Sequence, residues 1–247
     1  MEPDNSPQLN PQPQQPAPPA PTDQAWLPLP TEWPGAFKIY KVSKQAVRLN
    51  LEAIIVYGLL GLVLGYGLEL ALKTYGQLLA YIIGSLSTAI LTSLYIAGVR
   101  QQRLDLGAAF SKGLKFWLKI FLLNLLVTLT VGVSLLLLIV PFFFVWPRMV
   151  LVNYFLVDKD MGVIEAYKAS WQATKGNVSK IYGIVGANAA MALLVFTIIG
   201  IPFAIYFLVM YSAANAVLYE MILRHETQPG NNAAPVAMPP PAVAPTN

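Results

Sequence analysis

The chain has 247 residues, of which 56% are hydrophobic and 11% charged, with a formal net charge of +4. Soluble domains carry about 25% charged residues, so this composition argues against a water-soluble globule. Because the chain has no cysteine and a single histidine, His225, it excludes disulfide scaffolds, cysteine nucleophiles, thiolate zinc sites and metal sites with several histidines. We predict no metal site and no cofactor.

Proline divides the chain into three parts. Of the 20 prolines, eleven lie in residues 1–35 and six in residues 226–247. These stretches have few apolar residues to bury, so we expect residues 1–35 and 225–247 to form disordered, Pro-rich cytoplasmic tails. Residues 13–16 fit a PxxP ligand pattern, although a solubilising tether is the simpler interpretation. Trp26, Leu27 and Trp33 are candidates for anchoring at the membrane interface.

Long apolar intervals fill residues 36–224, which we predict to be one all-α, polytopic membrane domain. Residues 181–219 carry no charged side chain and residues 120–157 carry only Arg148. A helix needs about 20 apolar residues to cross a bilayer, so each interval has room for two spans. Pro141 interrupts one interval, and Gly200 with Pro202 interrupts the other, as is typical of turns between helices. With the pair upstream, we predict six transmembrane helices in three helical hairpins, at about 51–72, 76–99, 117–139, 141–157, 180–199 and 202–223.

The two later hairpins look like a sequence repeat. Three features recur 61 positions later in the chain: Lys119-Ile120 as Lys180-Ile181, Pro141-Phe142 as Pro202-Phe203, and Met149 as Met210. A short polar-faced segment precedes each hairpin, at residues 36–50, 105–116 and 162–177. The sequence therefore predicts one unit, a short interfacial helix followed by a helical hairpin, used three times.

The segment 162–177 carries the clearest amphipathic pattern. Tyr167 and Trp171 share one face, whereas Glu165 and Lys175 lie largely on the other, and Gly176-Asn177 supplies a helix stop. We predict an interfacial helix that contacts lipid. The alternative is a helix packed on other cytoplasmic segments and touching no lipid.

The distribution of cations predicts the orientation in the membrane. Fourteen of the 16 lysines and arginines fall before the first span, between spans two and three, between spans four and five, or after span six. By the positive-inside rule, both termini are cytoplasmic. The basic charge is then explained by topology and anionic lipid, and we expect no nucleic-acid partner. A five-span alternative, with 141–157 as a re-entrant loop, would place the cations of 158–180 outside.

Polar residues inside the predicted spans are the candidate functional residues. A central arginine costs roughly 2.5–3.5 kcal/mol on insertion scales, so Arg148 should bind an anionic ligand, close a buried ion pair or snorkel to the interface. Asn124, Asn153, Asn188 and Asn215 each stand alone in a span and either hydrogen-bond between helices or line a cavity. Glu52, Glu69 and Glu220 each have a cation four residues away, which predicts interfacial ion pairs such as Glu220 with Arg224.

Motifs for catalysis are missing from the sequence. His225-Glu226 lacks the second histidine of a zinc-protease helix. The chain has no phosphate-binding glycine loop followed by lysine, no nucleophile elbow and no pair of acids spaced for general acid–base chemistry. We therefore predict that the protein is not an enzyme.

Residues 139–177 carry a family resemblance. The matching positions are Pro141, Arg148, Asp158, Glu165, Ala166, Ser170, Trp171, Lys175, Gly176 and Asn177. This segment resembles uncharacterised bacterial multi-spanning proteins related to the membrane domain that accompanies some glycerophosphodiester phosphodiesterases. The chain lacks a soluble phosphodiesterase domain, so that activity does not carry over. The resemblance implies a location in the bacterial cytoplasmic membrane and assigns no site.

These observations predict a non-enzymatic integral inner-membrane protein that interacts with lipid or acts as a scaffold in envelope upkeep. A transporter or channel for a small or amphiphilic solute is the alternative, and a lipid-modifying membrane enzyme is the third possibility. Membrane lipid is the expected partner, while protein partners and the oligomeric state stay open.

Overall fold

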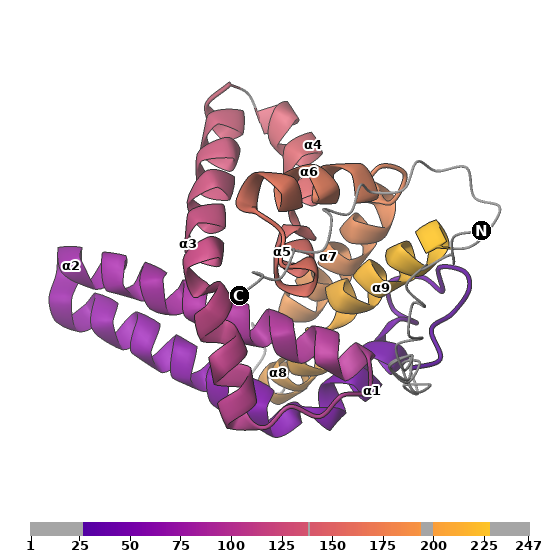
Figure 1. The fold of residues 1–247 in the computed structure, drawn as a ribbon, viewed down its shortest axis with the longest axis horizontal. Helices are drawn as coiled ribbons and strands as arrows, with labels where there is room; N and C mark the ends of the chain where they lie inside the picture. The colour runs from indigo at the N-terminus through magenta and orange to yellow at the C-terminus, as the bar shows by residue number, and fades with distance from the viewer. Residues whose placement is uncertain (1–26, 138, 194–199, 228–247) are drawn as a thin grey trace, which may run out of the picture.

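A computed structural model describes residues 27–137, 139–193 and 200–227, and these residues form helices and no strand (Figure 1). The helices, in chain order, are α1 (Tyr40–Leu49), α2 (Leu51–Val99), α3 (Leu106–Leu137), α4 (Ile139–Met149), α5 (Val152–Lys159), α6 (Val163–Ala173), α7 (Val178–Ala192), α8 (Gly200–Tyr211) and α9 (Ala214–Thr227). Most of the two predicted disordered tails, residues 1–26 and 228–247, lies outside the described residues.

Helix α2 doubles back on itself. The Ser87 side chain lies so close to Gly61 that a methyl group added at Gly61 would overlap it. In a straight helix, the 26 residues between the two positions would separate them by about 39 Å. At Gly76 the backbone of Leu68 is equally close. The bend therefore lies between residues 68 and 76, near the predicted turn, and the two arms run side by side (Figure 1).

Four helical segments of the described residues are long and apolar enough to cross a membrane: Leu51–Leu72, Tyr75–Val99, Leu106–Ser134 and Pro202–His225. Their mean hydropathy lies between 1.4 and 2.0. The prediction of an all-α membrane protein is confirmed at this level. The expected span 141–157 is divided between α4 and α5, with a break at residues 150–151, and the expected span 180–199 runs into residues 194–199, outside the described part. Both stay predictions.

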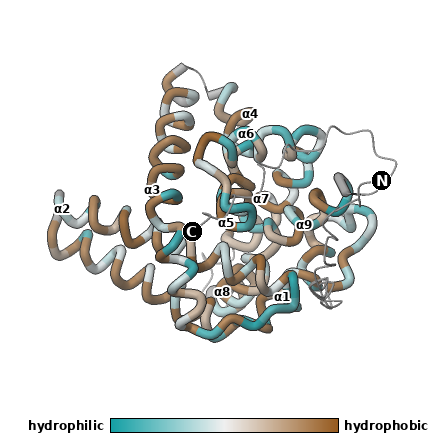
Figure 2. The backbone as a smooth tube through the Cα atoms, viewed as in Figure 1, coloured by the Kyte–Doolittle hydropathy of each residue, from teal (hydrophilic) through white to brown (hydrophobic). Residues whose placement is uncertain are grey.

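Large apolar side chains cover the outside of the first α2 arm and of α3, which appear mostly brown in Figure 2. Leu59, Val63 and Leu70 on α2, and Leu118, Leu129 and Leu136 on α3, are all more than half exposed. Soluble proteins rarely expose apolar patches beyond a few hundred Å². These faces are therefore suited to a lipid solvent.

The centre of the molecule is built by α5, α9 and the second arm of α2. The ring of Tyr219 lies between Tyr154, at 5.7 Å between centroids, and Phe155, at 4.9 Å in an edge-on contact. Leu94 of α2 is fully buried in the same cluster. The later halves of the two predicted Pro-led spans thus form the protein core.

The repeat predicted from the sequence corresponds to a repeated shape. Pro141 and Pro202 are each the third residue of a helix, α4 and α8, in the first turn, where proline removes no intrahelical hydrogen bond. Helix α4 ends at Met149, and the chain resumes as α5. Helix α8 ends one residue after Met210, and the chain resumes as α9. The residues predicted to form hairpin turns, Pro141, Gly200 and Pro202, thus lie in the first turns of α4 and α8, and residues 138 and 194–199 lie outside the described part of the chain.

Serines of two short helices occupy these breaks. The Ser170 hydroxyl of α6 donates to the Arg148 carbonyl at 2.6 Å. The Ser43 hydroxyl of α1 donates to the Met210 carbonyl at 2.7 Å. Both serines are fully buried. Each broken helix therefore has a carbonyl near its end satisfied by a neighbouring amphipathic helix.

Two segments differ from the sequence-based expectation. Within the predicted tail 1–35, Leu27 is buried and its N–H donates to the Val99 carbonyl at 3.4 Å, so residues from 27 onward pack on the folded body through their apolar side chains. The segment 105–116 is the first part of α3 and not a separate helix, because no break residue separates it from the apolar stretch that follows.

Candidate functional site

Arg100 joins three helices at a buried ionic cluster. It follows α2 directly, and its Nε donates to Glu220 Oε1 of α9 at 2.7 Å while its Nη1 pairs with Asp158 Oδ1 of α5. The Tyr219 hydroxyl donates to Asp158 Oδ2 at 2.9 Å, and Lys159 Nζ lies 3.5 Å from the same oxygen. The Asp158 and Glu220 side chains are 4% and 2% exposed.

Charge pairing outweighs burial at two members of this cluster, Asp158 and Arg100. Burial by itself would raise the pKa of the Asp158 carboxyl, but the hydrogen bond and charge of Arg100 hold that pKa below its ordinary value. Burial would likewise lower the pKa of Arg100, and its bonds to the two carboxylates raise that pKa instead. The cluster is therefore ionised at neutral pH at both of these residues.

Sequence reasoning missed this cluster. The predicted cation for Glu220 is Arg224 on the same helix, and its charge does act on Glu220, but the structure also brings in Arg100 from 120 residues away. Arg100 and Asp158 were read only as a loop cation and an acidic turn. Each of the two residues directly follows the end of an apolar stretch. This is the one local feature that indicates that both lie at the same depth, next to the ends of two predicted spans.

Arg148 contacts the end of α6. Its Nη1 donates to the Trp171 carbonyl at 3.3 Å and lies 3.5 Å from Thr174 Oγ1, and the guanidinium carbon lies 5.7 Å from the Trp171 ring centroid. The Trp171 carbonyl belongs to the last turn of α6, where a cation complements the helix dipole. Among the described residues, no carboxylate pairs with Arg148. A guanidinium has five N–H donors, and both of these contacts use the donors of Nη1.

The predicted interfacial helix is α6, and it packs through a face of small residues. Ala166, Ala169, Ser170 and Ala173 are buried, and the helix contacts α4 and α5. The Tyr167 and Trp171 rings stack at 6.2 Å, half-buried on one face. Glu165 and Lys175 are exposed.

Both ends of α6 have local stop signals. The Glu165 carboxylate accepts the Gly162 N–H at 3.1 Å, which satisfies a donor at the start of the helix. After the helix, Gly176 adopts a φ of +77°, in the left-handed region that favours glycine. The helix stop predicted at Gly176-Asn177 lies where α6 gives way to α7.

The predicted asparagines do not gather around Arg148. Asn124 Nδ2 of α3 donates to Ser85 Oγ of α2 at 3.3 Å, an interhelical contact. Asn188 donates to the Ile184 carbonyl in its own helix at 3.1 Å. Asn153 is half-buried on α5. Among the described residues, the buried Asn215 Oδ1 has no hydrogen-bond partner.

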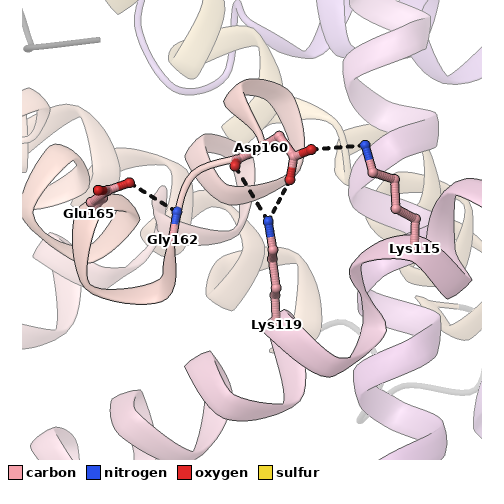
Figure 3. Close-up of polar contacts among 5 residues, drawn as sticks. All are labelled: Lys115, Lys119, Asp160, Gly162 and Glu165. Carbon is pink, nitrogen blue, oxygen red and sulfur yellow. Dashed lines mark hydrogen bonds and ion pairs between the residues drawn. The ribbon is translucent and has the colours of Figure 1, made fainter. Parts of the chain in front are cut away.

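A second ionic contact lies at the turn between α5 and α6 (Figure 3). Lys115 and Lys119 project from α3 toward Asp160, with Nζ–Oδ distances of 2.9 and 2.5 Å. Asp160 ends α5 in the left-handed conformation. The hydrogen bonds from both lysines hold the pKa of the Asp160 carboxyl below its ordinary value. All three side chains are substantially exposed to solvent.

A cavity of about 470 Å³ lies apart from these contacts, between the start of α2 and the loop before α3. Its polar lining comes from Asn50, Glu52, Arg103 and Asp105. The Asn50 side chain is occupied, since it donates to the Gln102 carbonyl at 3.0 Å and accepts from the Leu104 N–H at 2.9 Å. In the part of the chain that the structure describes, no group of three acidic or histidine side chains could hold a metal ion.

The chain matches no family model, no curated protein and no solved structure. The resemblance of residues 139–177 to membrane proteins associated with glycerophosphodiester phosphodiesterases therefore rests on those residues alone. In the structure, this segment forms α4, α5 and α6 and the start of the turn to α7. Its arginine and its serine–tryptophan pair are in direct contact.

Proposed function

We propose that the chain is a non-enzymatic integral protein of the bacterial inner membrane that binds lipid and serves as a scaffold in envelope upkeep. The observation that carries this proposal is the exposed apolar surface of α2 and α3, which has no use in water. The buried ionic cluster at Arg100 supports a fixed framework over a moving one.

Six spans with both termini in the cytoplasm are part of the same proposal. The predicted topology puts residues 100, 158 and 220 near the cytoplasmic ends of spans two, four and six, and Arg100 bonds to both acids. It also puts Lys115, Lys119 and Asp160 at one level, and these pair with each other. The inner-membrane location draws on the sequence resemblance.

A transporter is the second candidate, and the two broken helices favour it. Discontinuous helices at corresponding positions of two repeats often form the substrate site of secondary transporters. Here α4–α5 and α8–α9 break at corresponding positions, and Tyr154 and Tyr219 beyond the breaks stack on each other. Such a function requires a water-filled path beside Arg148 or Asn153.

Purification from bacterial membranes in mild detergent, followed by native mass spectrometry, tests the proposal. A lipid-binding scaffold should retain phospholipid and co-purify with protein partners. A chain that emerges free of both would contradict it. Single cysteines at Asn153 and at the lipid-facing Leu129 should both resist water-soluble thiol reagents in a scaffold, whereas a transporter should be labelled at Asn153 alone.

A further inference from the structure

Helix α3 presents three faces that follow one another around its axis. Its exposed apolar stripe consists of residues spaced three or four apart: Leu114, Leu118, Leu122, Leu125, Leu129, Val133 and Leu136. Lys115 and Lys119 each follow a stripe residue by one position, and the buried Phe116 and Ile120 follow the lysines. Successive residues are about 100° apart on a helix. The two lysines therefore line the boundary between the lipid-facing stripe and the protein core.

The lysines also lie at the right depth for a lipid headgroup. From Lys119 to Leu137, the end of α3, 18 residues rise about 27 Å at 1.5 Å each. The hydrocarbon core of a bilayer is about 30 Å thick. If α3 crosses the membrane, its lysine pair reaches the level of the phosphates on the side where the apolar stripe begins.

Asp160 brings the two ammonium groups together without neutralising them. Lys115 Nζ and Lys119 Nζ each bind one oxygen of the same carboxylate, which leaves a local charge of +1. Lys119 Nζ also donates to the Asp160 backbone carbonyl at 3.4 Å. An ammonium group has three donors, so each lysine retains at least one N–H for a further acceptor. Their side chains are 63% and 40% exposed, which leaves room for one.

We propose that Lys115 and Lys119 form a binding site for an anionic phospholipid, with the phosphate on the two ammonium groups and an acyl chain along the α3 stripe from Leu118 to Leu129. This site rests on the proposed lipid-binding function and gives it a place and a headgroup charge. Asp160 is a positioning residue that keeps the lysines converged.

Titration of the delipidated protein with phosphatidylglycerol or with neutral phosphatidylcholine, followed by native mass spectrometry, tests the site. A lysine near an anionic headgroup contributes about fivefold in affinity. The variant Lys115→Gln/Lys119→Gln should therefore bind phosphatidylglycerol at least tenfold more weakly and phosphatidylcholine as before. The charge-conserving variant Lys115→Arg/Lys119→Arg should retain most of the binding, which separates a charge effect from a folding defect.

A matched control is Lys38→Gln/Lys41→Gln, because these two lysines are exposed at α1 and the change in net charge is the same. An equal loss of phosphatidylglycerol in the control would overturn the site, as would an equal loss of both lipids in the α3 variant. Displacement of phosphatidylglycerol by inorganic phosphate would also overturn it, since the acyl chain would then contribute nothing. Unchanged selectivity in the α3 variant, with lipid still retained, would refute this site and leave the proposed function standing.

Discussion

One guanidinium holds two buried carboxylates at the centre of the chain. Taking charged groups out of water costs several kcal/mol per ion, and only good pairing geometry offsets this cost. Arg100 provides such geometry by binding Glu220 through Nε and Asp158 through Nη1. Tyr219 and Lys159 also contact Asp158, so Asp158 keeps a hydrogen bond and a nearby cation when Arg100 is lost. The two acids should therefore respond differently to the loss of charge.

Arg100→Met should lower the free energy of unfolding by about 3–5 kcal/mol, because it leaves two carboxylates buried without their cation. Glu220→Gln should cost about 1 kcal/mol, since the amide oxygen still accepts from Arg100 and the pair with Asp158 remains. Unfolding in mixed micelles of increasing denaturing-detergent content measures both values. If both variants lower the free energy of unfolding by the same amount, Arg100 does not stabilise Asp158 in addition to Glu220.

The low pKa of Asp158 predicts the pH dependence of this contribution. A carboxyl group whose pKa is lower in the folded chain stabilises the fold above its unfolded pKa of about 3.9. The stabilisation is lost as the pH falls through the lower folded value. The difference in stability between the wild type and Asp158→Asn should therefore be constant from pH 7 to about pH 5 and shrink below about pH 4. A difference that grows on acidification would contradict the sign of this shift.

Arg148 should act through α6 and its tryptophan. Arg148→Gln removes both the stacking on Trp171 and the charge at the end of α6, so it should lower the free energy of unfolding by about 1–2 kcal/mol. Arg148→Lys keeps the charge but loses the planar group, so it should cost about half as much. In a Trp171→Leu background, Arg148→Gln should cost clearly less, because the two residues are coupled. Full additivity, together with loss of bound lipid in Arg148→Gln alone, would instead assign Arg148 to a ligand.

At the scale of elements, the backbone at Gly176 sets where α6 ends. With φ at +77°, Gly176→Ala should destabilise the chain by about 1 kcal/mol. Gly186 is the matched control, because it lies within α7 and has nothing within 4 Å of an added methyl group. Gly186→Ala should stabilise α7 by up to about 1 kcal/mol through helix propensity. Thermal unfolding of both variants in detergent measures the opposite signs.

Elements whose signals are local could be predicted from the sequence. The first α2 arm, Leu51–Leu72, matches the span predicted at about 51–72, because an uninterrupted apolar run is a property of that segment alone. The faces of α6 follow from its three- and four-residue spacing, and the end of α6 follows from Gly176. Each of these features needs only the residue and its neighbours within about two helical turns.

Features set by distant residues could not be predicted. The break at residues 150–151 has a local signal, since Pro147 inside α4 predicts a kink just before it, but the hydroxyl that binds the nearby Arg148 carbonyl comes from Ser170 of another helix. Arg100 and Asp158 are 58 residues apart and carry no shared motif. The partner of each group depends on how the helices pack, which composition and periodicity do not encode.

Across the whole molecule, the ionic contacts connect α2, α3, α5 and α9 around Asp158 and Asp160. Asp158 and Asp160 are two residues apart, yet they bind cations from different helices: Arg100 after α2, and Lys115 and Lys119 on α3. The tip of the α2 hairpin and the C-terminal end of α3 point away from this place in different directions (Figure 1). A membrane arrangement with these ionic groups at the cytoplasmic face leaves the α2 tip on the far side.

Cysteine labelling of intact cells tests that arrangement, and the chain suits it because no native cysteine interferes. Ser170 is fully buried, so a cysteine there would stay unlabelled on either side of the membrane. Lys168 on α6 is exposed, and Tyr75 at the α2 tip is 79% exposed. The predicted topology puts fourteen of the 16 cations on the cytoplasmic side, so an impermeant reagent should label Tyr75→Cys and label Lys168→Cys only after the cells are lysed. Labelling of Lys168→Cys in intact cells would place residues 158–180 outside and favour the five-span alternative, in which residues 141–157 form a re-entrant loop.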